Sequence, residues 1–192
     1  MPEKFKQKYA IQSTRLPGYD YSQNGMYFVT ICARGQECFF GEVKNGKMIL
    51  NEIGKIADRF WREIPKHFPF IKLDVHQIMP NHLHGNLEII DAPPRRDAIN
   101  RASTGNRVST GGITGKYNPM GKNSLGEIIR WYKGRCKFEI NKQLNSVGFS
   151  WQSRFYDRVI RNGTELQKIR EYIINNPKMW ERDRNNAEGI WI

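Results

Sequence analysis

The sequence predicts an α+β domain with a ferredoxin-like (RRM-like) antiparallel sheet and helices packed on one of its faces. Three observations lead to this fold class. The segments follow in the order strand, helix, paired strands, helix, strand, helix, which is typical of a ferredoxin-like sandwich. The length of 192 residues suits a single domain, and a hydrophobic fraction of 39% is enough to build a core.

The strands are predicted from runs of β-branched and aromatic residues. The run over residues 27–33 has such side chains throughout, as a central strand covered on both faces does. Residues 38–44 and 47–50 flank Asn45-Gly46, a dipeptide that favours a two-residue hairpin turn. Further strands are expected at residues 70–79, 82–90 and 149–161, the first two joined by a tight turn at Pro80-Asn81.

Three helices are predicted from apolar residues at helical spacing. A polar capping residue precedes each of them, namely Asn51, Ser124 and Thr164. Glu127 and Gln167 complete capping boxes in the second and third helices. The first helix is expected to end at Pro65 and the third before Pro177.

Positive charge dominates the composition. Lys and Arg number 31 against 19 Asp and Glu, which gives a net charge of +12. This excess fits a polyanionic partner, with nucleic acid as the first interpretation and an anionic membrane surface as the alternative. No apolar run is long enough to span a bilayer and the amino terminus is charged, so we expect a cytoplasmic protein without a membrane segment. The three cysteines form no CxxC pair and are expected to be reduced thiols.

The chain is expected to divide into a basic arm at residues 1–25, a folded domain at 26–180 and a tail of mixed charge at 181–192. Within the domain, residues 91–123 are rich in Pro, Gly, Ser and Thr and predict a flexible basic loop. The second helix has a basic outer side with an aromatic residue beside it. This side either binds nucleic acid or is an ordinary solvated surface, and its candidate residues are Arg130, Trp131, Lys133, Arg135 and Lys137.

His82 and His84 lie two positions apart on a predicted strand. Side chains alternate between the faces of a strand, so both imidazoles point to one face while Leu83 points to the other. Two imidazoles placed in this way can bind one metal ion. The alternative is a pair of surface histidines on a half-solvated strand.

Tyr172 and Asn176 are the second pair of candidates. They lie four residues apart on the third helix and therefore share one of its faces. Each residue also has a structural interpretation, Tyr172 as an aromatic at the edge of the core and Asn176 as a helix terminator before Pro177.

Taken together, these motifs resemble the REP-associated tyrosine transposases, which belong to the single-tyrosine branch of the His-hydrophobic-His (HUH) endonucleases. Several separated motifs, in the order of that family, carry the resemblance. They are Met79-Pro80-Asn81-His82-Leu83-His84-Gly85, Phe149-Ser150-Trp151-Gln152, Phe155-Tyr156-Asp157, Ile160-Arg161-Asn162 and Glu171-Tyr172-Ile173-Ile174-Asn175-Asn176-Pro177, with further likeness at residues 15–22, 25–32 and 124–141. The resemblance thus covers about residues 15–180 without the loop.

The resemblance implies a role for each candidate. His82 and His84 would be metal ligands, Tyr172 the nucleophile, and Asn176 the third protein ligand, where better-known insertion-sequence enzymes have a glutamine. Tyr156 would be structural. With mixed nitrogen and oxygen ligands, the metal is expected to be Mg²⁺ or Mn²⁺.

The implied activity is that of a metal-dependent nuclease and strand transferase that forms a 5′-phosphotyrosine on single-stranded DNA. The resemblance further suggests that a DNA hairpin near the cut is recognised by the second helix and the amino-terminal arm, in which Arg15 is a candidate contact. No G-x-x-x-x-G-K-[ST] pattern occurs, which agrees with a reaction that uses no nucleotide cofactor. The protein could act as a monomer or a homodimer. A non-catalytic nucleic-acid-binding module and a metal-dependent hydrolase with a water nucleophile are the alternatives.

Overall fold

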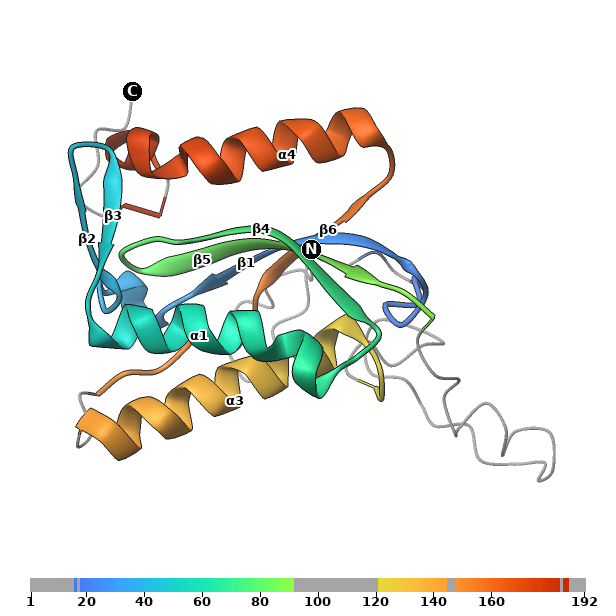
Figure 1. Cartoon of the computed structure of the whole chain (residues 1–192), viewed down its shortest axis with the longest axis horizontal. Coiled ribbons are helices and arrows are strands. Elements are labelled where there is room, and N and C mark those ends of the chain that lie inside the picture. The colour runs from blue at the N-terminus through green and yellow to red at the C-terminus, as the bar shows by residue number, and fades with distance from the viewer. Residues whose placement is uncertain (1–15, 17, 92–120, 145–147, 184, 187–192) are drawn as a thin grey trace, which may run out of the picture.

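A computed structural model of the chain describes residue 16 and residues 18–91, 121–144, 148–183 and 185–186. Its centre is a four-stranded antiparallel sheet in the order β4-β5-β1-β6 (Figure 1). The strands are β1 (Gly25–Cys32), β4 (Ile71–Ile78), β5 (His82–Ile89) and β6 (Tyr156–Ile160). The helices are α1 (Glu52–His67), α3 (Leu125–Leu144) and α4 (Gly163–Asn175), followed by the 3₁₀ segment η2 (Asn176–Arg182). The predicted antiparallel α+β class is confirmed.

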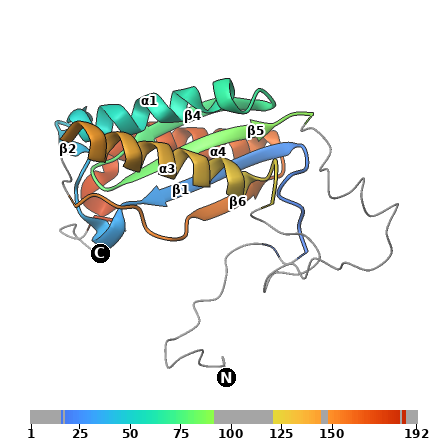
Figure 2. The same cartoon turned by 90° about the horizontal axis from the view of Figure 1, so that it is seen from below.

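The helices cover both faces of the sheet, not one face as predicted. Helices α1 and α3 pack together on one side, and α4 lies across the other side (Figures 1 and 2). The physical reason lies in β1, which has large apolar side chains on both faces. Val29 belongs to the main core, whereas Phe28 packs with Ile160 of β6 and Ile173 of α4 in a second, smaller cluster. Without α4, these apolar side chains would be left in water.

The pairing register decides which residues face α4. His84 lies opposite Thr30, and His82 lies opposite Cys32, in the antiparallel pairing of β5 with β1. The alternate residues of β5, including Leu83 and Leu87, are fully buried in the core on the α1 side. Gly85 also belongs to that side, where the indole of Trp61 fills the space that a Cβ atom would need. One strand therefore provides core packing on one face and the histidine pair on the other.

A smaller hairpin stands beside this sandwich. It consists of β2 (Gly41–Lys44), which begins later than the predicted strand at residues 38–44, and β3 (Lys47–Leu50), as predicted. Both turn residues have positive φ, 52° at Asn45 and 69° at Gly46, as a type I′ turn requires.

Several other predicted boundaries differ from the structure, beginning with the first strand, predicted at residues 27–33 and observed at Gly25–Cys32. Helix α1 continues past Pro65 to His67, because the backbone N–H of Phe68 still donates to the carbonyl of Ile64. Helix α4 is capped by Asn162, whose side chain accepts the N–H of Glu165, and not by Thr164. The last strand covers Tyr156–Ile160 only.

The segment before that strand packs against the core without forming a continuous strand. Trp151 makes one isolated bridge to Ala33, and its ring packs against Phe40. The apolar residues of this segment therefore pack against the core, and this is why their pattern predicts a strand.

The predicted flanking parts are described only in part. Most of the predicted loop, residues 92–120, and residues 1–15 of the predicted arm lie outside the described residues. Tyr21, within the predicted arm, is 2% exposed and packs in the main core beside Tyr27. In the predicted tail, Asp183 and Asn185 are buried as well. Among the described residues, no helix has both the length and the apolar character needed to cross a bilayer.

Candidate active site

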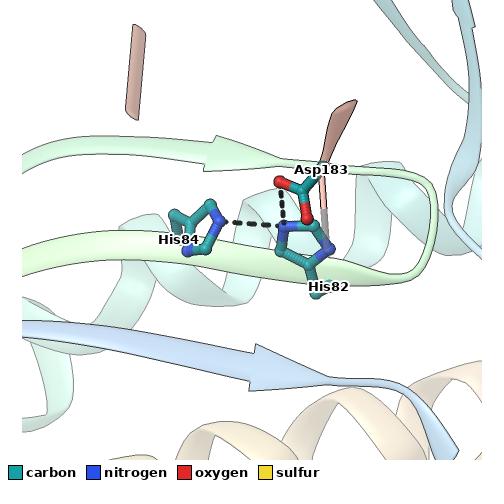
Figure 3. Close-up of side chains that lie close together, drawn as sticks. All are labelled: His82, His84 and Asp183. Atoms are coloured by element: carbon teal, nitrogen blue, oxygen red, sulfur yellow. Dashed lines mark hydrogen bonds and ion pairs between the residues drawn. The ribbon is translucent and has the colours of Figure 1, made fainter. Parts of the chain in front are cut away.

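The histidine pair lies on the face of β5 that α4 and η2 cover. The exposed fractions of His82 and His84 are 0% and 1%, so the interpretation as surface histidines is wrong. The two Nε2 atoms lie 2.9 Å apart, and the ring centroids are 4.4 Å apart. The predicted convergence of the two imidazoles is therefore present in the structure (Figure 3).

Asn81 fixes the orientation of His82. Its Nδ2 donates to the backbone carbonyls of Gln36 at 2.9 Å and Asn185 at 2.6 Å. These two acceptors settle which end of the amide is nitrogen, so Oδ1 faces His82 Nδ1 at 2.7 Å and accepts its proton. In a neutral imidazole, the other nitrogen then has a lone pair. Asn81 thus directs the Nε2 lone pair of His82 toward the centre of the site.

His84 is held from the neighbouring strand. The Thr30 hydroxyl lies 2.9 Å from Nδ1 of His84, and the ring of Phe28 stacks on the imidazole with centroids 5.5 Å apart. A hydrogen-bond partner at Nδ1 leaves Nε2 as the nitrogen that faces His82. The pairing of Thr30 with His84 across the two strands explains why this contact forms.

Tyr172 reaches the same place from α4. Its hydroxyl lies 3.1 Å from Nε2 of His84, although 88 positions separate the two residues. The side chain is 45% exposed, whereas both histidines are buried. The phenol is therefore accessible from solvent and in contact with the imidazole of His84.

Two contacts fix α4 over the sheet. Ile173 is fully buried against Phe28, and Arg170 donates to both carboxylate oxygens of Asp74 at 2.9 and 3.0 Å. Burial raises the pKa of Asp74, but hydrogen bonds from Arg170 and Asn86 outweigh this and lower the pKa overall. Asp74 lies in a register shift of β4, where an extra residue turns its side chain toward α4.

A carboxylate completes the cluster. Oδ2 of Asp183 lies 4.0 Å from Nε2 of His82, and its Oδ1 accepts the backbone N–H of Asn185 at 2.7 Å. The possible ligand atoms of His82, His84 and Asp183 all lie within 4.8 Å of one another (Figure 3). Asp183 comes from the segment after η2, which folds back over the histidines.

Asn176 lies beside this carboxylate. It is 2% exposed and its Nδ2 donates to Oδ2 of Asp183 at 3.0 Å. Within the described part of the chain, its buried Oδ1 has no hydrogen-bond partner. The predicted role of Asn176 as third ligand stays a prediction, and Asp183 is a second residue that could take this role.

The cluster fits a divalent cation. His82 and His84 bring two nitrogen atoms close together, and both Nδ1 positions are occupied by other contacts. With both Nε2 atoms unprotonated, their lone pairs would face and repel each other, and a cation between them would remove this repulsion. The buried Oδ1 of Asn176 also needs a positive partner, because a buried unsatisfied carbonyl is costly. Two imidazoles with carboxylate and amide oxygens can bind Mg²⁺, Mn²⁺ or Zn²⁺.

The predicted DNA-binding residues are not part of this cluster. Helix α3 lies on the opposite side of the sheet (Figure 2). Arg130, Arg135 and Lys137 are exposed there, whereas Trp131 stacks on His67 with centroids 4.6 Å apart. Nζ of Lys133 donates to the backbone carbonyls of Gln152 and Arg154, so this residue stabilises the segment before β6. Arg15 lies outside the described residues.

Sequence reasoning missed Asp183, Asn81 and Thr30. Asp183 stands in the charged run Glu181-Arg182-Asp183-Arg184, which has the composition of a solvated surface. The available signal was Trp180, since an aromatic residue just before this run indicates a packed segment. Its ring lies 6.0 Å from the ring of His82.

Comparison with solved structures places this fold in a known class. The chain is similar to the REP-associated tyrosine transposase solved with a REP hairpin, with a TM-score of 0.51 and 14% sequence identity over 90% of this chain and 74% of that chain. The fold is therefore that of the REP-associated tyrosine transposases, as the resemblance in the sequence predicted. No family model matches the chain.

A closer relative in sequence shows the family. An uncharacterized protein of Haemophilus influenzae is 35% identical over 174 residues, which are 90% of this chain and 91% of the relative. The chain belongs to the same family as this protein.

Proposed function

We propose that the protein is a metal-dependent endonuclease and strand transferase that acts on single-stranded DNA through Tyr172. The observation that supports this most directly is the distance of 3.1 Å between the Tyr172 hydroxyl and Nε2 of His84 within one chain. A structural tyrosine at the edge of the core would not need a buried pair of imidazoles as its partner. The similarity in fold to a tyrosine transposase adds support.

In the proposed reaction, Oη of Tyr172 attacks the scissile phosphorus. The bond between phosphorus and tyrosine oxygen forms while the bond to the 3′-oxygen breaks, which leaves a 5′-phosphotyrosine and a free 3′-hydroxyl. The tyrosine loses a proton and the departing oxygen gains one, so neither water nor a nucleoside triphosphate is consumed. A 3′-hydroxyl can later reverse the exchange and join two strands.

The chain's own residues would bind and orient the cation. His82 and His84 would each supply Nε2, while Asn81 and Thr30 hold the opposite nitrogens. Asp183 or Asn176 would supply an oxygen ligand. A bound Mg²⁺ or Mn²⁺ would stabilise charge on the phosphate in the transition state.

The proposed substrate is a single strand that carries a hairpin. The similar transposase was solved with a REP hairpin, and the net charge of +12 suits a polyanion. Arg130, Arg135 and Lys137 are exposed cations on α3 that could contact the stem of such a hairpin, and Arg15 is a further candidate.

The test is a covalent-adduct assay with hairpin-bearing single strands and Mn²⁺. The wild type is expected to form a denaturation-resistant protein–DNA adduct, and Tyr172→Phe is expected to form none while it still binds the DNA. Tyr19→Phe is a matched control because Tyr19 packs against Tyr21 and Tyr27, on the core side of the sheet. An adduct of normal yield with Tyr172→Phe would overturn the assignment.

A second arm separates the alternatives. A binding module would bind the strands equally well in chelator and after His82→Ala with His84→Ala, and would never cleave them. A hydrolase with a water nucleophile would still cut the strands without the Tyr172 hydroxyl and would leave no adduct.

A further inference from the structure

A groove of about 740 Å³ runs along the outer edge of β6, away from the histidine pair. β6 is the last strand of the sheet, so its outer edge has no strand partner among the described residues. The groove is lined from both sides of this edge and from the first turns of α4. The charged residues that line it are Asp157, Arg158, Arg161, Glu165 and Lys168, and Tyr156 lines it as well.

Two cations in the groove are available for a ligand. Arg158 pairs with Glu165 at 2.5 Å, so these two charges offset each other. Arg161 and Lys168 are exposed, and neither has a salt bridge within the described part of the chain. The backbone N–H of Arg161 donates to Glu165 at 2.9 Å, which fixes its main chain, and the residue is exposed. The groove therefore presents two positive side chains beside a strand edge that no other described strand covers.

One of the residues that line the groove lies one helical turn before the proposed nucleophile. Lys168 precedes Tyr172 by four residues, so the two side chains share a face of α4 and lie about 6 Å apart along its axis. On the sheet, Phe28 contacts Tyr156 on one side and Tyr172 on the other, with centroids 6.2 Å apart in each pair. The buried ring of Phe28 thus lies between a residue of the groove and the phenol.

We propose that this groove binds the single-stranded DNA segment that flanks the scissile phosphate. Arg161 and Lys168 contact backbone phosphates, and Tyr156, which is half-buried, offers a ring on which a base stacks. The combination of cations along a cleft with an aromatic platform is what single strands require. A duplex cannot offer its bases in this way, so the groove selects unpaired DNA. The proposal rests on the proposed function for the position of the scissile phosphate.

The experiment measures binding of a fluorescein-labelled oligothymidylate in EDTA by fluorescence anisotropy at several salt concentrations. EDTA prevents metal-dependent cleavage, so binding is read alone. Arg161→Ala with Lys168→Ala is expected to weaken binding roughly tenfold and to reduce the salt dependence by about 1.4 in the log–log slope, as the loss of two phosphate contacts on a single strand does. Tyr156→Leu is expected to weaken binding several-fold without changing that slope.

A charge-matched control excludes a general effect of net charge. Lys47→Ala with Lys66→Ala removes two exposed cations from β3 and α1 and is expected to leave the slope within the range of the wild type. Equal losses in both double variants, or none in the groove variant, would overturn the proposal. If the groove variant binds normally and the adduct at Tyr172 also forms, the groove assignment is wrong and the proposed function stands. If the wild type binds no oligothymidylate, the groove assignment is also wrong, and the adduct assay then decides separately on the proposed function.

Discussion

Nδ2 of Asn176 donates to Oδ2 of Asp183 at 3.0 Å, and this bond joins the end of α4 to the segment that folds back over the histidines. Both residues are buried and both could supply an oxygen ligand. The bond also leaves Asn176 with its Oδ1 as the atom that lacks a partner among the described residues. The two residues therefore form one unit, and their roles can be separated only by changing each alone.

We expect Asp183→Asn to weaken Mn²⁺ binding at least about tenfold, because it removes the only carboxylate among the clustered residues. The measurement is isothermal titration calorimetry of the purified protein with MnCl₂. Asn176→Ala tests the amide in the same way. Glu181→Gln is the control, since this exposed carboxylate lies two residues away. Unchanged affinity in both Asp183→Asn and Asn176→Ala would mean that neither residue is a ligand.

Thr30→Val is expected to weaken Mn²⁺ binding by about tenfold, because the near-isosteric change removes the hydroxyl that holds Nδ1 of His84. Thr30→Ser keeps the hydroxyl and should restore most of the affinity. If Thr30 had only a structural role, both variants would have a lower free energy of unfolding, and their affinities for Mn²⁺ would be equal. Chemical denaturation in EDTA provides that comparison.

The Asp58 carboxylate is expected to stabilise the protein at neutral pH and to lose this effect at acid pH. Burial raises the pKa of Asp58, but hydrogen bonds from His76 and Arg62 outweigh this and lower the pKa to about 2. A carboxylate whose pKa is lower in the folded state contributes stability above its unfolded pKa of about 4, and the contribution is lost as the pH falls toward 2. The Asp58 side chain is about a quarter exposed, so we expect the contribution to be about 1–2 kcal/mol.

The measurement for Asp58 is urea denaturation of the wild type and Asp58→Asn between pH 7 and pH 3. The difference in the free energy of unfolding is expected to be largest near neutral pH and to shrink below about pH 4. Glu52→Gln is the control, because it removes an exposed carboxylate from the same helix. A difference for Asp58→Asn that stays constant over this range would contradict the prediction.

Gly85→Ala is expected to destabilise the protein by about 1–3 kcal/mol, because the new methyl group would overlap the indole of Trp61. Thermal unfolding followed by circular dichroism measures this change. Gly134→Ala is the matched control, since a Cβ at Gly134 in α3 meets nothing within 4 Å. That variant is expected to be more stable by about 0.5–1 kcal/mol, as alanine is in a helix interior. Equal effects of the two changes would show that Trp61 adapts easily.

Local patterns predicted much of the fold. The alternation in β5 correctly placed His82 and His84 on one face, and helical spacing correctly placed Tyr172 beside the packed stripe of α4. Apolar residues on both faces of β1 already indicated that both sides of the sheet are covered. The sequence does not say which helix covers which side, since that depends on contacts between distant segments.

The rest of the site depends on such long-range contacts. The bond from Asn81 to the carbonyl of Asn185 spans 104 positions, and no local pattern indicates it. Asp183 joins the cluster because the segment after η2 folds back, whereas its neighbours in sequence have the composition of a solvated surface. Local sequence patterns therefore do not identify polar residues that act through tertiary hydrogen bonds.

The alternation of β5 between core and site limits how this family can vary. Loss or gain of a single residue inside the strand would rotate every later side chain by half a turn and exchange leucines for imidazoles. Because His82 and His84 alternate with core leucines, a shift of one residue near the turn would move both histidines out of the site and expose the hydrophobic core. We therefore expect length differences among relatives to accumulate in the connections, while the strand itself tolerates only replacements.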